Sequence, residues 1–392
     1  MLIYESAALT VIVYFVIIGV SPRLRSRRGA LTFACLALVV YAPWLMARAH
    51  GALLGAVATW LAGTWVFASL FALAVGLPLL LVKGAVRLWR RRTTRPRSST
   101  APRDESRREF IGNVALPAVA LSLGGGGALG GVSSFVIKRV EIGIRNWPKA
   151  LEGFRIGQIT DTHVGDFVRP NVVARAVEAL NDSDVHLQVM TGDLVDNLEH
   201  LESTFEALEH CRAPHGMLTV LGNHEKMHHR LEPTLAAYAR RRSRGIVRLL
   251  VDSSEVLRHN GAPLRIVGVD YPMHVNGNHF LRRPQRLVLM QKSAQLAFAQ
   301  ESESRDAVLC LSHHPEFFPL AAERGAELTL SGHTHGGQIA VDGKSIFSTY
   351  QYMLGHYQLG DSHLYVSGGT GHWLPVRFGV PTEVTVITLR SA

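Results

Sequence analysis

The sequence predicts an α/β domain that follows a helical membrane region. Three observations support this prediction. The first 90 residues are dominated by long uncharged apolar runs, whereas the remainder mixes charged, polar and apolar residues as soluble domains do. From about Arg139 onward, short apolar runs alternate with helical patterns, which is typical of a buried sheet covered by helices. The length of 392 residues also exceeds one ordinary compact unit.

Residues 1–92 contain about three candidate membrane helices. Three runs approach the roughly 20 mainly apolar residues that a spanning helix needs: Ala7–Val20, Leu31–Ala47 and Ala58–Val82. The last run is the second part of the stretch Gly51–Val82, which is too long for one simple span and could instead form two short helices. A fourth uncharged run, residues 111–137, is rich in glycine and is expected to form either a further membrane helix or a tether.

The arginines around these runs predict the membrane topology. The loop Ser21–Ala30 and the linker 93–110 are rich in arginine, whereas the loop after the second run has only Arg48. Positive charge favours the cytoplasmic side, so the chain begins outside. If 111–137 spans the membrane, residues 138–392 face away from the cytoplasm. The stretch Ser106–Ile111 resembles a twin-arginine export signal, and an ordinary basic stop at a helix end explains it equally well.

The positive charge does not indicate nucleic-acid binding. The whole chain carries +10, but residues 1–110 carry +11 and the remainder carries −1. A nucleic-acid-binding face needs its basic patch on the folded domain. The arginines are therefore better explained by membrane topology, with the lipid bilayer as the partner.

The C-terminal part, residues 138–392, alternates strand and helix patterns. The predicted strands are Arg155–Thr160, Val185–Thr191, Met217–Leu221, Leu264–Val269, Ala307–Ser312 and Glu327–Ser331. The predicted helices are Pro170–Leu180, Leu198–Glu209, Glu232–Arg241 and Pro284–Gln300. The tail is expected to be mainly β, with strands at Ser345–Tyr350, His363–Ser367 and Glu383–Leu389.

Polar residues that can bind metals follow five of these strands directly. They are Asp161 with His163, Asp193 with Asp196, Asn223 with His224, His313 with His314, and His333 with His335. Ligand sites of open α/β sheets gather beyond the carboxyl ends of the strands, so these side chains are expected to converge. In an extended segment residues i and i+2 point the same way, so each Asp-x-His or His-x-His pair can aim two ligands at one place. Gly192, Gly222 and Gly332 are expected to let the backbone turn sharply.

One such histidine is more often packed or exposed than bound to a metal, but five ordered clusters at strand ends are hard to explain by chance. Mixed oxygen and imidazole ligands suit Mn, Fe or Zn better than Mg or Ca. The residues therefore predict a metal site.

The sequence resembles the calcineurin-like metallophosphoesterase family. Its motifs D-x-H, G-D-x-x-D, G-N-H-E/D, a later His and G-H-x-H all occur in order between Asp161 and His335. The segment Phe154–His163 and the ending Pro375–Glu383 resemble bacterial membrane-associated or exported phosphoesterases. The resemblance covers about residues 138–390 and implies a four-layer α/β/β/α sandwich with two divalent metal ions.

The resemblance also implies a role for each site residue. The first metal would be held by Asp161, His163, Asp193 and His335, and the second by Asp193, Asn223, His313 and His333. His313 is preferred to His314 because family members place the ligand two residues before a proline. His224 would be the catalytic histidine and Asp196 would orient it. Related members often carry an arginine at the position of Gly368, so that contact is expected to be missing or moved here.

These assignments imply a membrane-anchored phosphodiesterase. A metal-bridging hydroxide would attack the phosphate ester, and His224 would protonate the leaving oxygen. A lipid headgroup, a cell-envelope phosphodiester and a soluble nucleotide are all open as substrates, and the membrane attachment favours the first two. The competing interpretation is a membrane scaffold or binding module with a non-catalytic metal site, but such proteins usually lose ligands, and none is missing here.

Overall fold

The structure is a computed structural model that describes residues 135–165, 168–227, 230–242, 245–274, 281–299, 306–341, 344–345, 349–372, 377 and 379–392. All of them belong to one compact unit. The predicted membrane helices, the basic linker and the possible export signal lie outside these residues. Among the described residues, no helix is both long and apolar enough to span a bilayer.

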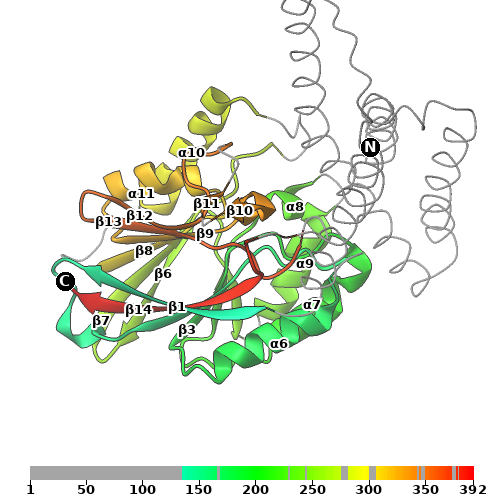
Figure 1. Ribbon diagram of the computed structural model, residues 1–392, viewed down its shortest axis with the longest axis horizontal. Helices are drawn as coiled ribbons and strands as arrows, with labels where there is room; N and C mark the ends of the chain where they lie inside the picture. Colours follow the sequence, from blue (N-terminus) through cyan, green and yellow to red (C-terminus); the bar gives the residue numbers. More distant parts are fainter. Residues whose placement is uncertain are drawn as a thin grey trace, which may run out of the picture. The chain divides into compact units, whose positions relative to one another are not determined.

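Two six-stranded sheets form the centre of the unit (Figure 1). The first has the order β1 (Val136–Ile144), β14 (Glu383–Ser391), β2 (Arg155–Ile159), β3 (Leu187–Met190), β4 (Met217–Thr219) and β5 (Val247–Leu249). The second has the order β12 (Gly355–Leu359), β13 (Ser362–Val366), β9 (Leu328–Ser331), β8 (Ala307–Leu311), β7 (Ala262–Gly268) and β6 (Ser253–His259). A small hairpin joins β10 (Ala340–Val341) to β11 (Lys344–Ser345).

Both sheets have a parallel centre. Strands β2 to β5 run parallel, and so do β13, β9, β8 and β7. The edge strands β6 and β12 are antiparallel to their neighbours, as is β14 to β2. Parallel strands leave their carboxyl ends at the same edge of a sheet, which is where the loops of the candidate site begin.

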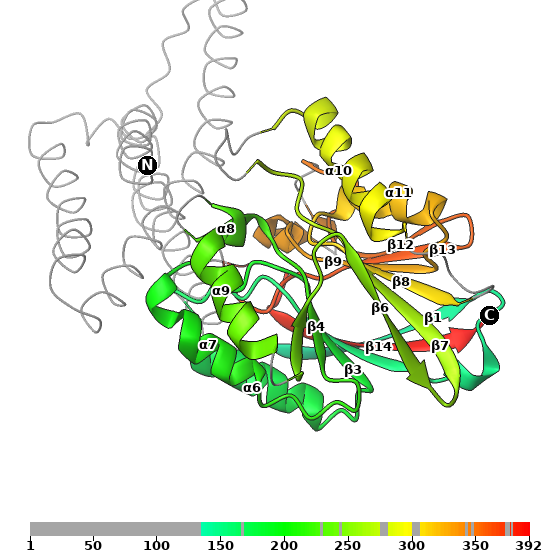
Figure 2. The same cartoon turned by 180° about the vertical axis from the view of Figure 1, so that it is seen from behind.

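Helices cover the outer face of each sheet (Figures 1 and 2). The helices are α6 (Pro170–Asn181), α7 (Leu201–Leu208), α8 (Asn223–Lys226), α9 (Leu231–Arg242), α10 (Arg283–Ala297) and α11 (Phe318–Glu323). Short 3-10 turns are η3 (Lys149–Leu151), η4 (Leu198–His200), η5 (Pro315–Phe317) and η6 (His335–Gln338).

Three hydrophobic clusters lie between adjacent layers and hold them together. Between the sheets, Leu187 and Leu218 of the first pack with Leu309 of the second. The outer face of the first sheet packs against α6, α7 and α9, and that of the second against α10 and α11. The predicted α/β class is thus confirmed, with helices, two sheets and helices in four layers.

Two expectations about strands need adjustment. Only Ser345 of the expected strand Ser345–Tyr350 lies in a described strand, and Thr349 and Tyr350 form a bend that brings the Tyr350 hydroxyl to His333. Strand β1 begins at Val136, inside the uncharged run 111–137. The last two residues of that run therefore pair in the sheet with β14.

Candidate metal centre

The structure brings the predicted ligand residues together at one edge of the two sheets. Asp161 follows β2, and Asp193 follows β3 in the first sheet. His313 and His333 follow β8 and β9 in the second. Their side-chain atoms form overlapping groups in which all potential ligand atoms lie within 4.8 Å of one another. The centre is therefore assembled from both sheets.

The backbone of these ligand segments is left-handed, whereas the sequence predicted an extended conformation. The Asp-x-His and His-x-His segments are not extended: φ is +51° at Asp161, +47° at His163, +72° at His333 and +50° at His335. Asp193 is also left-handed, with φ +56°. Strand alternation was thus the wrong reason for the pairing. Left-handed conformations are unfavourable for such residues and persist where the surroundings impose them, commonly at functional sites.

One half of the centre consists of Asp161, His163 and His335. The Nε2 atoms of the two histidines lie 3.0 Å apart, and His335 Nε2 lies 3.3 Å from Asp161 Oδ1. The His333 backbone N–H donates to both Asp161 oxygens, at 2.9 and 3.0 Å. Two imidazole nitrogens and a carboxylate oxygen therefore face one point inside the protein.

The other half consists of Asp193, His313, His333 and Asn223. Asp193 Oδ2 lies 3.1 Å from His313 Nε2 and 3.6 Å from His163 Nε2, so this carboxylate faces both halves. Asp193 Oδ1 accepts a hydrogen bond from the His224 backbone N–H. The His313 ring is held from behind, because its Nδ1 lies 2.7 Å from the Thr191 carbonyl oxygen.

These side chains fit a pair of divalent cations. Asn223 Oδ1 is buried and has no hydrogen-bond partner, which is costly for an amide oxygen unless a ligand is bound there. The carboxylates of Asp161 and Asp193 are also buried, and carboxylates in such places are paired or bind metals. Carboxylate, amide and imidazole donors together match the ligands of Mn, Fe and Zn.

Two glycines make room for the carboxylates. A Cβ on Gly222 would lie 2.1 Å from Asp193 Oδ1, and a Cβ on Gly332 would lie 2.0 Å from Asp161 Oδ2. Neither glycine has a positive φ, unlike Gly192 at +93°. Close approach of the backbone to the carboxylates, rather than a sharp turn, therefore requires glycine at 222 and 332.

His224 and Asp196 lie beside the centre as a pair. His224 Nδ1 is 2.6 Å from Asp196 Oδ1, and the same oxygen is 3.0 Å from His163 Nδ1. Burial tends to raise the pKa of Asp196, but the neighbouring His163 and His224 hold it well below its usual range. Asp196 thus stays ionised and orients both imidazoles.

The carboxylates also attract positive charge to the centre. Burial alone would lower the pKa of His163, but Asp196, Asp193 and Asp161 together raise it to about 9. Burial likewise opposes protonation of His313, whose pKa the carboxylates of Asp193 and Asp161 raise to about 9. Without metal, the carboxylates therefore favour protons on these histidines, and bound metals would have to displace those protons.

Several supporting residues were not singled out from the sequence. The Glu225 carboxylate accepts hydrogen bonds from the backbone N–H groups of Asp193, Leu194 and Gly222, and so ties two loops of the centre together. Its place in the Gly-Asn-His-Glu motif was the available signal. His333 Nε2 lies 3.1 Å from the Tyr350 hydroxyl. No sequence pattern marked that tyrosine.

A buried arginine lies next to the loop in which the family arginine was missing. Arg377 donates from Nη1 to the Gly368 carbonyl oxygen at 2.6 Å and from Nη2 to His335 Nδ1 at 2.8 Å. Burial lowers the pKa of Arg377 to about 10, so it is still a cation at neutral pH. A guanidinium therefore supports the centre from position 377, which the sequence expectation left open.

Of the two adjacent histidines, the structure places His313 at the carboxylates and His314 to one side. His314 Nδ1 accepts a hydrogen bond from the Glu316 backbone N–H, and its ring stacks on His333 at 4.9 Å between centroids. This position agrees with the choice of His313 as the candidate ligand.

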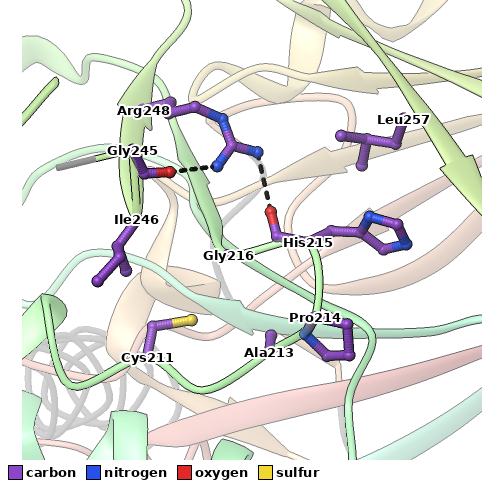
Figure 3. A pocket seen from close by; sticks show the side chains of 9 residues that line it. All are labelled: Cys211, Ala213, Pro214, His215, Gly216, Gly245, Ile246, Arg248 and Leu257. Atoms are coloured by element: carbon purple, nitrogen blue, oxygen red, sulfur yellow. Dashed lines mark hydrogen bonds between the residues drawn. The ribbon is translucent and has the colours of Figure 1, made fainter. Parts of the chain in front are cut away.

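A cavity of about 420 Å³ lies away from the centre, before β4 (Figure 3). It is lined by Cys211, His215, Arg248 and six smaller or apolar residues. Arg248 donates to the carbonyl oxygens of Gly245 and His215, both at 2.8 Å, and to Glu255 (Figure 3 shows the first two). The Arg248 guanidinium thus already has partners within the protein. None of the residues that line the cavity belongs to the candidate centre.

Comparison with known proteins agrees with the centre. Residues 154–337 match the family model described as calcineurin-like phosphoesterase. The chain is 30% identical to an uncharacterized metallophosphoesterase of Bacillus subtilis, over 73% of this chain and 98% of that one. It is 30% identical to an uncharacterized metallophosphoesterase of Helicobacter pylori over 59% of this chain and 58% of that one. A Danio rerio relative, named as a transmembrane protein with a metallophosphoesterase domain, is 26% identical over 64% of this chain and 57% of that one. The chain thus spans a little over half the length of these last two relatives.

Proposed function

Because this chain belongs to the calcineurin-like phosphoesterase family and is a metal-dependent hydrolase of phosphate esters, we propose that it is a membrane-anchored phosphodiesterase. The convergence of Asp193 with histidines from both sheets is the observation that carries the hydrolytic part of the proposal. It gives one carboxylate a position shared by two cation sites.

The chain supplies two sets of ligands. Asp161, His163, Asp193 and His335 would hold one divalent ion, and Asp193, Asn223, His313 and His333 the other. Mn, Fe or Zn suits these donors. When bound, two such ions supply Lewis-acid activation of water and neutralise charge on the phosphate.

His224 is proposed as the proton donor to the leaving oxygen. It is half-buried, and its Nδ1 is held by the ionised carboxylate of Asp196 at 2.6 Å. That contact fixes the ring and leaves Nε2 to give a proton to the ester oxygen as the P–O bond breaks. An alkyl leaving group needs this proton more than an aryl leaving group, because an alkoxide is the stronger base.

The side chains around the centre favour a diester over a monoester. A monoester dianion has one more charged oxygen than a diester, and a guanidinium of the protein could pair with that oxygen beside two bound cations. Two described guanidiniums beside the centre already hydrogen-bond within the protein: Arg377 with Gly368 and His335, and Arg230 with the Val195 carbonyl oxygen at 3.3 Å. A singly charged diester does not need such a partner, which supports it as the proposed substrate.

Membrane anchoring is proposed from the uncharged runs in residues 1–92, with the catalytic domain on the extracytoplasmic side. Relatives from Danio rerio and Bos taurus bear names that describe them as transmembrane proteins. A phosphate ester of lipid or cell-envelope origin is the substrate class that such a location offers.

The test is to compare bis(nitrophenyl) phosphate with nitrophenyl phosphate, using the full chain in detergent after loading with Mn²⁺ or Zn²⁺. We expect the higher kcat/KM with the diester. A preference for the monoester would overturn the diesterase assignment. Two tightly bound metals without turnover of either ester would instead support a scaffold with a non-catalytic site.

A further inference from the structure

His333, a candidate ligand of the second cation, is oriented differently from the other candidate histidine ligands. The other three are anchored through Nδ1, which lies 2.7 to 3.0 Å from a partner: Asp196 for His163, Thr191 for His313 and Arg377 for His335. Their Nε2 atoms face the carboxylates of the centre. For His333 it is Nε2 that has partners, 3.1 Å from the Tyr350 hydroxyl oxygen and 3.4 Å from the Tyr271 hydroxyl oxygen. Nδ1 is therefore the nitrogen of His333 that is left for a cation.

Aromatic rings enclose His333 on several sides. The ring centroids of Tyr350 and Tyr271 lie 5.3 and 5.4 Å from the His333 centroid, and His314 stacks on the same ring at 4.9 Å. When Nδ1 binds a cation, Nε2 carries the ring proton and donates it to the tyrosine oxygens. The two hydroxyls thus fix both the orientation of the His333 ring and the place of its proton.

Tyr271 is also tied to the first sheet. Lys226 Nζ donates to the Tyr271 carbonyl oxygen at 3.1 Å and pairs with the Asp270 carboxylate. Lys226 ends α8, and α8 begins at Asn223, the other side chain that is a candidate ligand of the second cation only from that loop. Lys226 and Tyr271 therefore link Asn223 of the first sheet to His333 of the second.

We propose that Tyr350 and Tyr271 are positioning residues that hold the His333 ring for the second cation and thereby set the affinity of that site. Partners of this kind fix the orientation of a metal-binding imidazole, and their removal typically lowers metal affinity about ten- to hundredfold. A phenol keeps its proton at neutral pH, so each hydroxyl acts on the imidazole rather than as a ligand of its own. The inference rests on the ligand role of His333 in the proposed function, but metal binding tests it without turnover.

The first experiment measures the affinity for each of the two cations, with no substrate present. The full chain in detergent is freed of metal by chelation, and Zn²⁺ binding is followed by competition with a chromophoric chelator. We expect Tyr350→Phe to weaken one of the two affinities about ten- to hundredfold and to leave the other unchanged. Tyr271→Phe should have a smaller effect on the same affinity, because its hydroxyl lies farther from Nε2.

Tyr352→Phe is the matched control. Tyr352 lies two positions from Tyr350, and its ring packs on Phe318 and Tyr357, at 5.6 and 5.1 Å between centroids. Removal of its hydroxyl should leave both affinities unchanged. Unchanged affinities in Tyr350→Phe, an equal loss of both affinities, or the same loss in the Tyr352→Phe control would overturn the proposal.

A second experiment asks whether Tyr350 acts through His333. The variant His333→Ala is compared with the double variant His333→Ala/Tyr350→Phe in the same binding assay. If the hydroxyl acts only on the imidazole, its removal should change the remaining affinities by less than about twofold once the imidazole is gone. A further loss as large as the one seen with His333 present would show that the hydroxyl acts independently of His333, and would refute the positioning role.

Turnover of a diester separates this proposal from the proposed function. In Tyr350→Phe we expect turnover to fall at limiting Zn²⁺ and to recover when free Zn²⁺ exceeds the weakened dissociation constant. A loss that persists at saturating Zn²⁺ would mean that the hydroxyl contacts the substrate, which contradicts the proposal. If the unmodified chain binds two cations and hydrolyses neither a diester nor a monoester, the proposed function fails, and the binding comparison still decides the role of Tyr350. If it binds fewer than two, the ligand assignment and this proposal fail together.

Discussion

At the scale of single residues, Asp193 is the candidate ligand that contacts both halves of the centre. One of its carboxylate oxygens lies near histidines of both halves, at 3.1 and 3.6 Å, and the other accepts the backbone N–H of His224. A neutral amide in this place would weaken two cation sites at once. Replacement of Asp193 should therefore lower metal content and turnover more than replacement of a ligand that serves one site.

We expect Asp193→Asn to lower metal content and to reduce turnover more than any other ligand substitution. The measurement is metal per chain by elemental analysis beside kcat on a diester. Asp184→Asn is the control, because Asp184 is also left-handed, with φ +49°, but exposed and away from the centre. An Asp193→Asn protein that keeps two metals and a near-normal rate would contradict the bridging position.

His224→Ala should keep both metals and lose most diester turnover. General acid–base groups contribute about a hundred- to ten-thousand-fold, so a loss in this range is expected with an alkyl leaving group and a smaller one with nitrophenolate. His210→Ala, at an exposed histidine, serves as the control. Equal losses for both leaving groups would argue against proton donation. Loss of a metal would make His224 a ligand, which its proximity to His163 and Asp193 leaves as the competing role.

At the same scale, the sequence motifs predict the candidate metal ligands but not the residues that hydrogen-bond to them. Asp161, Asp193 and His335 stand in short patterns that sequence displays directly. Arg377 reaches His335 from 42 positions away, and the resemblance of the segment Pro375–Glu383 gave this arginine no role. Contacts of this kind depend on tertiary packing, which local periodicity does not report.

At the scale of elements, the buried strands and the four longest described helices were predictable, whereas the short helices α8 and α11 and the edge strands were not. The expected strands at 155–160, 185–191 and 307–312 contain β2, β3 and β8, which are buried over most of their length. The edge strands β6 and β12 have neighbours on one side only and mix exposed with half-buried residues. Their sequences therefore lack the continuous apolar run of a buried parallel strand.

A histidine cluster at the opposite ends of the strands makes stability depend on pH. His186, His215 and His259 surround Phe154, with ring centroids 4.9 to 5.9 Å from it. Burial, and then the positive charge of His259 and Arg155, lowers the pKa of His186 from 6.5 to about 4. Between these pH values the unfolded chain binds more protons than the folded chain, so folding stability falls as pH drops from about 6.5 to 4.

We expect the midpoint of urea unfolding to rise with pH over this window, and His186→Asn to flatten the rise. Asparagine keeps an acceptor for the Arg155 backbone N–H, which donates to His186 Nδ1 at 2.9 Å, but it does not titrate. The exposed His210→Asn change should leave the slope as it is. An unaltered slope in His186→Asn would show that other groups carry the pH dependence.

At the scale of the whole molecule, the two sheets share one core and one centre. Ligand candidates from β2, β3 and β4 meet those from β8 and β9, and the core between the sheets fixes their separation. The family fold was predictable because the motifs lie at strand ends in the order that the fold needs. The membrane helices remain a prediction, because residues 1–134 lie outside the described structure.

The proposed topology places the catalytic domain outside the cytoplasm. Its basis is the asymmetry of arginines around the uncharged runs. Protease added to right-side-out spheroplasts should remove the domain after about residue 137. Cleavage only in inverted vesicles would reverse the topology and leave the phosphoesterase assignment intact.

The central claim is that two divalent metals at this centre are required for hydrolysis of a phosphate ester. It is tested most directly by chelating the full chain and restoring Mn²⁺ or Zn²⁺ while diester turnover and bound metal are followed together. We expect turnover to vanish in the metal-free protein and to reach its maximum at about two metals per chain, as two-metal sites require. Turnover that survives complete metal removal, or that is maximal with one metal, would contradict the account.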